Sequence, residues 1–149
     1  MSKHEEADLI LKLYDLRREA TMRKAREWYF REFNPQSVAD ISAVMFGEQG
    51  GYLRMVWSYW DMAAALVNHG AISGELFNDT NGEYLGVFLK MEPLLTAARV
   101  EIGPQLLANV EKLIDATPDG RAKLEIMRQR MQEIQAKMAA RGAQATAKA

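Results

Sequence analysis

Apolar side chains cover most of one segment near the middle of the chain, residues 51–72. At about 100° of rotation per residue, one narrow sector of this segment holds all of Arg54, Ser58, Asp61, Ala65 and Asn68. The rest of the circumference is apolar or aromatic and includes Trp57 and Trp60. A helix that is hydrophobic on most sides is either buried among other helices or inserted in lipid.

The membrane alternative does not fit this segment. A spanning helix needs about 20 mostly apolar residues, and Arg54 and Asp61 interrupt the run. The pattern therefore predicts the central helix of a bundle, at about residues 52–69. Gly70 follows it and suits the left-handed residue that ends a helix.

Helical spacing of apolar residues recurs before the central segment. Two stripes there are out of phase, which predicts two helices at about 5–17 and 20–33 with a break near residues 18–21. A single long helix is the alternative. Ser37, followed three positions later by Asp40, predicts the start of a short helix.

After the central segment, the spacing predicts a helix over residues 81–102, opened by a capping box from Thr80 to Glu83 and kinked at Pro93. A helix over 104–116 follows, with Pro104 in its first turn. No segment alternates with period two for long enough to predict a strand. We therefore expect an all-α, single-domain bundle of about six helices, its core formed by residues 52–69 and 81–102.

The last predicted helix has a different pattern from the others. Thr117 and Pro118 predict its start, and its apolar residues follow a heptad spacing of three, four, three and four: Leu124, Met127, Met131, Ile134 and Met138. We call these five residues the seam. A seam of two heptads is too short to be stable alone, so we expect the helix to dock on its own bundle or on a partner.

The pattern divides the chain into three parts. Residues 1–116 form the helical bundle core and residues 117–140 the docking helix. Residues 141–149 have little apolar surface, which predicts a disordered tail.

Charge is distributed unevenly, although the net charge of the 149 residues is −1. Residues 12–31 hold seven basic and three acidic side chains, residues 32–120 four and twelve, and residues 121–149 seven and two. Basic ends on either side of an acidic middle could bind a partner, or they could be the solvated faces of amphipathic helices. Near the N-terminus, acidic residues such as Asp15 and Glu19 dilute the basic side chains, so we expect no nucleic-acid partner.

The chain has no cysteine, which excludes thiol catalysis and fits a reducing cytoplasm. The N-terminus is acidic where a signal peptide would be basic, so we expect no export and no membrane span. His4 and His69 are the only histidines, and no Glu-x-x-His pair, zinc spacing or phosphate loop is present. We therefore expect no metal site, no cofactor and no enzymatic activity.

Arg54 and Asp61 are the strongest polar candidates, because they lie two turns apart on the polar strip of the central helix. If that strip faces a cleft, they could hold a small ligand together with Trp57 and Trp60.

Two other interpretations of the strip stay open. It could be the solvent-exposed line of a packed helix, or its charges could pair with residues such as Arg99 or Glu83. Aromatic residues at helical spacing belong to a core more often than to a pocket.

Three tracts resemble a family of small bacterial helical proteins that is catalogued as a domain of unknown function. They run from Leu13-Tyr14 to Ala25-Arg26, from Tyr59-Trp60 to Asn68-His69-Gly70-Ala71-Ile72, and from Tyr84 through Glu92-Pro93-Leu94-Leu95 to Arg99. The resemblance covers about residues 9–115 and leaves the seam outside. It implies an all-helical fold and a bacterial source, and it supplies no activity or site residues.

The sequence thus favours a non-enzymatic module for helical protein–protein interaction or oligomerisation, acting through the seam. The partner would be a second copy of the chain or another helical protein. A sensor that binds a small ligand beside the central helix is the alternative.

Overall fold

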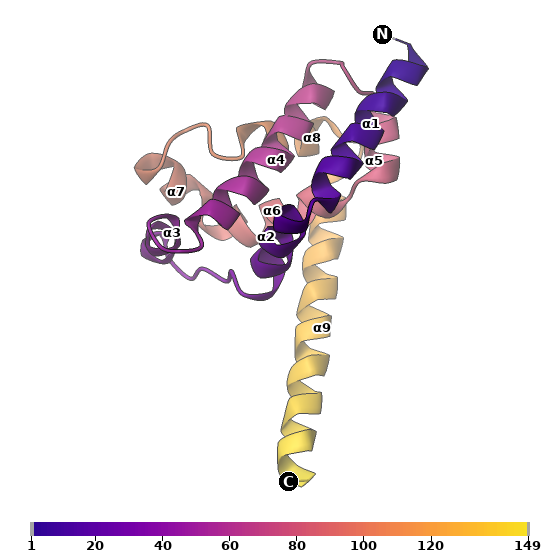
Figure 1. Cartoon of the computed structure of the whole chain (residues 1–149). Helices are drawn as coiled ribbons and strands as arrows, with labels where there is room; N and C mark the ends of the chain where they lie inside the picture. The colour runs from indigo at the N-terminus through magenta and orange to yellow at the C-terminus, as the bar shows by residue number, and fades with distance from the viewer. Residues whose placement is uncertain (1, 149) are drawn as a thin grey trace.

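Helix α4 (Gly50–Asn68) lies at the centre of an all-α domain (Figure 1). The computed structural model describes residues 2–148. In this range the other helices are α1 (Lys3–Arg18), α2 (Ala20–Arg31), α3 (Val38–Met45), α5 (Gly74–Thr80), α6 (Glu83–Met91), the 3-10 turn η1 (Glu92–Leu94), α7 (Leu95–Glu101), α8 (Ala108–Ala116) and α9 (Gly120–Lys148). The predicted all-α, single-domain fold is confirmed.

Helix α4 packs chiefly against α2 and α8, and also against α3, α5 and α6. Its apolar residues explain this position, because the neighbouring helices completely bury Leu53, Val56 and Trp60, which share one face of α4. Gly70 ends the helix in the left-handed region, at φ 82°. The amide of Ala71 donates to the carbonyl of Leu66 there, as in a Schellman motif. The predicted end of the central helix is confirmed.

The two out-of-phase stripes at the N-terminus form two helices, α1 and α2, as predicted. Glu19 adopts an extended conformation between them, with ψ 142°. Its carboxylate accepts hydrogen bonds from the amides of Thr21 and Met22 at 3.0 and 2.9 Å. These bonds lower the pKa of Glu19 and fix the start of α2.

The predicted helix over residues 81–102 is divided into α6, η1 and α7, because Pro93 lies in the 3-10 turn. The predicted capping box at its start is wrong. The Thr80 hydroxyl donates back to the carbonyl of Leu76, within α5. The carboxylate of Glu83 instead pairs with Arg26 of α2 at 2.7 Å.

Two further helix starts differ from the predictions. Helix α8 begins at Ala108 and not at Pro104, after Leu107 in the left-handed region at φ 52°. Helix α9 begins at Gly120, where a Cβ atom would lie 2.0 Å from the carbonyl oxygen of Ile114. The Thr117 hydroxyl donates to the carbonyl of Leu113 and therefore does not cap α9.

The first turns of α9 pack on α6 and α8, and the helix then leaves the body of the domain (Figure 1). Every residue from Gln132 to Lys148 is exposed. The predicted disordered tail is corrected for residues 141–148, which continue the helix, whereas residue 149 lies outside the described residues. Four of these eight residues are alanine or arginine, which have high helix propensity. We call residues 132–148 the outer half of α9.

Candidate functional site

The polar strip of α4 faces the loop between α7 and α8. Arg54, Trp57 and Asp61 line a cavity of about 580 Å³ there, together with Ser58 and residues 102–107 of the loop. The structure therefore brings together three of the four residues that the sequence suggested as a ligand site. Trp60 does not line this cavity.

Asp61 lines this cavity and also holds the start of α8, directly after the loop that forms the other side of the cavity. One carboxylate oxygen accepts hydrogen bonds from the amides of Asn109 and Val110, at 2.9 and 3.0 Å. The other accepts from the side-chain amide of Asn109 at 3.0 Å. Asp61 thus caps the N-terminus of α8 from another helix, where a negative charge is also favoured by the helix dipole.

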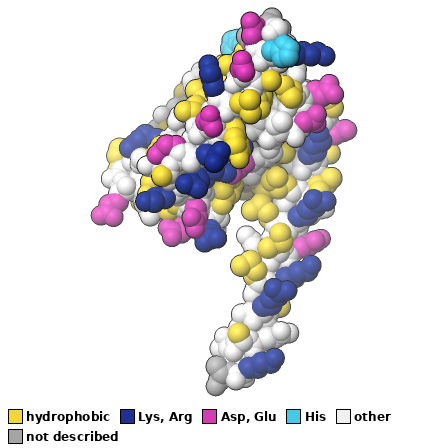
Figure 2. All heavy atoms as spheres, turned by 45° about the vertical axis from the view of Figure 1, so that its right-hand side comes forward, with side chains coloured by type: hydrophobic (Ala, Val, Ile, Leu, Met, Phe, Trp, Pro, Cys, Tyr) yellow, Lys and Arg dark blue, Asp and Glu magenta, His cyan; other side chains and the backbone are white. Residues whose placement is uncertain are grey.

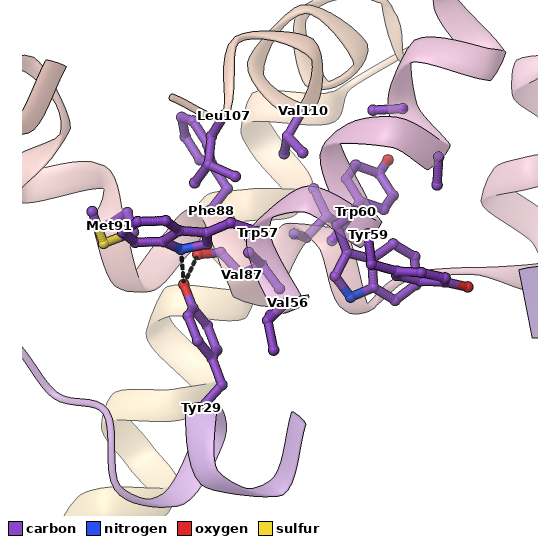
Figure 3. Close-up of a cluster of buried hydrophobic side chains, with 14 of the residues drawn as sticks. Tyr29, Val56, Trp57, Tyr59, Trp60, Val87, Phe88, Met91, Leu107 and Val110 are labelled. Carbon is purple, nitrogen blue, oxygen red and sulfur yellow. Dashed lines mark hydrogen bonds between the residues drawn. The ribbon is translucent and has the colours of Figure 1, made fainter. Parts of the chain in front are cut away.

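Trp57 joins α4 to two other helices. Its indole N–H donates to the Tyr29 hydroxyl at 3.3 Å, and that hydroxyl donates to the carbonyl of Val87 at 2.7 Å (Figure 3). Complete burial raises the pKa of Tyr29. The ring of Trp57 is 6% exposed, so it forms part of the core and part of the cavity floor.

Trp60 is fully buried on another side of α4, at a cluster of charged side chains. Its indole N–H donates to the carboxylate of Glu83 at 3.0 Å. Arg26 donates two hydrogen bonds to the same carboxylate, at 2.7 and 2.8 Å, which raises the pKa of Arg26. The guanidinium of Arg17 lies 5.6 Å from the centre of the Trp60 ring and donates to Asn81 at 2.6 Å. We call Arg17, Arg26, Trp60 and Glu83 the Glu83 cluster.

The Glu83 cluster connects four helices that carry parts of all three tracts quoted above. Next to it, the hydroxyl of Tyr59 donates to the carbonyl of Leu13 at 2.5 Å, and burial raises the pKa of Tyr59. Arg26 and Glu83 are 57 positions apart, so no local spacing could have predicted their pairing. The cluster holds α1, α2, α4 and α6 together.

One alternative left open by the sequence was that Arg54 and Asp61 pair with Arg99 or Glu83, and neither pairing occurs among residues 2–148. Arg99 of α7 pairs with Glu111 of α8 at 2.8 Å, and its hydrogen bond lowers the pKa of Glu111. Arg54 is exposed and donates only to the carbonyl of Met45, at 3.2 Å, among residues 2–148.

The five seam residues divide into an inner and an outer group. Leu124 is 2% exposed, and Met127 and Met131 are partly buried against the core. Ile134 and Met138 are 56% and 67% exposed. Apolar side chains thus continue along α9 below the body, beside basic side chains (Figure 2). The seam begins on its own bundle and extends beyond it.

In the part of the chain that the structure describes, no group of three or more His, Asp or Glu side chains is arranged to hold a metal ion. No helix in residues 2–148 combines the length and the apolar character that crossing a membrane requires. Both histidines are exposed.

Comparison with protein families places most of the chain in one of them. The family model described as a domain of unknown function, DUF4760, matches residues 4–117. Comparison with curated proteins and with solved structures gave no match. The matched range contains α1 to α8 with the cavity and the Glu83 cluster, and it stops before α9. The chain therefore belongs to the DUF4760 family of domains of unknown function.

Proposed function

We propose that this protein is a non-enzymatic helical interaction module that associates with a second copy of itself through the outer half of α9. The observation that carries the proposal is the division of the seam. Its first members pack on the body, whereas Ile134 and Met138 continue the same apolar stripe in solvent, 56% and 67% exposed.

Without a partner, the outer half of α9 would have little to stabilise it as a helix. Short isolated helices are marginal in water, since most helical stability in proteins comes from packing of an apolar face. In the outer half that face consists of Ile134 and Met138, and further along it only alanine and polar residues follow. Covering these two side chains would stabilise both the helix and the complex.

Charge favours contact between α9 of one copy and the body of the other. Residues 121–149 carry seven basic and two acidic side chains, whereas residues 32–120 carry four and twelve. Two outer halves pairing only with each other would bring basic residues such as Lys137 and Arg141 close together. An arrangement in which each α9 reaches the acidic body of its partner avoids this repulsion.

A cavity beside α9 offers apolar contacts on the body; its lining includes Lys90 and no acidic side chain. It measures about 400 Å³ and lies where α9 leaves the body, with Phe30, Leu89, Leu94 and Met131 among its lining. Arg128 also lines it, but its charge is paired with Glu92 at 2.6 Å. We infer that the cavity receives Ile134 or Met138 of the second copy.

We also propose that the protein works in the cytoplasm of a bacterium. The absence of cysteine fits a reducing compartment such as the cytoplasm, and the resemblance described above supports a bacterial source.

Removing the outer half tests the proposed association. A chain that ends at Met131 keeps all the seam residues that pack on the body, and the described residues that it loses, 132–148, are all exposed. We expect the full chain to form a dimer at micromolar concentration in light scattering, and the shortened chain to be a folded monomer. A full chain that remains monomeric up to about 100 μM, a concentration at which even weak dimers form, would refute self-association and leave another helical protein as the partner.

A further inference from the structure

The cavity between α4 and the α7–α8 loop has the size of a small-molecule site. Its volume of about 580 Å³ falls within the range of about 300–1,000 Å³ that is usual for ligand pockets. It lies within the residues matched by the family model and away from the outer half of α9. Whatever it binds is therefore independent of the proposed dimer.

The walls of the cavity are apolar and held in place. Trp57 lines it from α4, and Ile102, Leu106 and Leu107 line it from the loop. Leu107 has φ 52°, a left-handed conformation that is unfavourable for a leucine. Asp61 holds the chain directly after it with three hydrogen bonds at 2.9 to 3.0 Å. Strained residues that the surrounding structure fixes are common at ligand sites.

The guanidinium of Arg54 is a positive charge at the cavity, and most of its N–H groups are not used in hydrogen bonds among residues 2–148. Arg54 lines it, is exposed, and uses one N–H group on the carbonyl of Met45. It takes part in none of the ion pairs formed among residues 2–148. The carboxylate of Asp61, by contrast, is occupied by α8. The polar group of the cavity that can bind a ligand is therefore a single guanidinium, which favours an anion.

We propose that this cavity binds a small amphipathic monoanion, with an apolar or aromatic body against Trp57 and Leu107 and an acidic group on Arg54. A guanidinium binds a carboxylate or sulfonate through charge-assisted hydrogen bonds. A polyphosphate is a poor fit, because Arg54 is the one basic residue of the lining and Asp61 adds a negative charge beside it.

Two fluorescent probes of similar shape test the proposal on the full chain. 8-Anilinonaphthalene-1-sulfonate carries one anionic group, and N-phenyl-1-naphthylamine lacks it. We expect saturable binding of both probes at one site. Arg54→Gln should raise the Kd of the sulfonate probe about 10-fold, because the charge-assisted bond is lost, and should leave the Kd of the neutral probe within about 2-fold.

Two further variants control the result. Ser58→Phe places a ring in the cavity from an exposed position of α4, so it should weaken both probes at least about 10-fold. Arg31→Gln removes an exposed arginine outside the cavity and should change neither Kd. Probe binding that survives Ser58→Phe would place the probes elsewhere, for example on the seam, and would overturn the proposal. Absence of saturable binding, or equal effects of Arg54→Gln and Arg31→Gln, would overturn it as well.

Discussion

Glutamate at both Ile134 and Met138 is expected to weaken self-association at least about 100-fold. Burying these partly exposed side chains contributes about 1 kcal/mol each, and a symmetric dimer buries two from each copy. Each 1.4 kcal/mol changes the dissociation constant about tenfold. Glutamate removes the apolar contacts and would also have to be buried as a charge, which adds to the loss. Sedimentation velocity over a series of concentrations measures the change.

The matched control for this pair is Ala136→Glu with Ala140→Glu. These alanines have the same spacing on the same exposed part of α9 but lie on the side of the helix opposite to the seam. They introduce the same two charges, so we expect dimerisation to persist with a modest change in affinity. If both double variants abolish the dimer equally, the effect comes from charge alone and the seam is not the interface.

Alanine at Glu83 is expected to destabilise the fold by about 3 kcal/mol. The carboxylate accepts two hydrogen bonds from Arg26 and one from Trp60, and the Arg26 and Glu83 side chains are only 24% and 23% exposed. Its removal leaves a partly buried guanidinium and an indole N–H without their partner, which costs more than the pair itself contributed. In urea unfolding the midpoint should fall by about 1.5 M.

Glu27→Ala provides the comparison, because Glu27 also pairs with an arginine, Arg31, at 2.9 Å. Those two side chains are 61% and 76% exposed, and such surface pairs contribute about 0.5 kcal/mol or less. We expect its unfolding midpoint to stay close to that of the unchanged protein. Equal midpoints for Glu83→Ala and Glu27→Ala would contradict the structural role of the Glu83 cluster.

Apolar periodicity was sufficient to predict the fold class and the central helix. The sequence of α4 has few polar positions and is interrupted by two charges, so it predicted a helix buried among other helices and not one inserted in lipid. The out-of-phase stripes likewise predicted the break between α1 and α2, because a helix cannot keep both stripes on one face. These features depend on side chains within one segment, which a sequence displays directly.

The helix starts that differ depend on residues elsewhere in the chain. A helix with Pro104 in its first turn was expected, but α8 begins at Ala108, and the amides at its start are bound by Asp61, 48 positions away. Thr80 and Thr117 have the residue type of an N-cap, yet both hydroxyls donate to carbonyls of the preceding turn. Threonine is common in both roles, so its type alone does not distinguish them.

The candidate ligand site also combines features that one segment displays with features that depend on distant residues. Of the four residues suggested as a ligand site, Arg54, Trp57 and Asp61 line one cavity beside the neighbouring loop. Trp60 does not line it, because the spacing on α4 does not reveal which neighbour each side meets. Its partner Glu83 could not be found from α4 at all. For the seam, the heptad spacing identified the members, whereas the point at which the body ends was visible only in three dimensions.

Hydrogen exchange in the outer half of α9 is the most direct measurement of the proposed association. Amides of an uncovered helix exchange rapidly through local opening, and packing against a partner slows them. We expect peptides from residues 132–148 to be protected at high protein concentration and to lose protection on dilution, while peptides from residues 121–131 stay protected throughout. Rapid exchange of residues 132–148 at every concentration would contradict the account, because the seam would then remain uncovered.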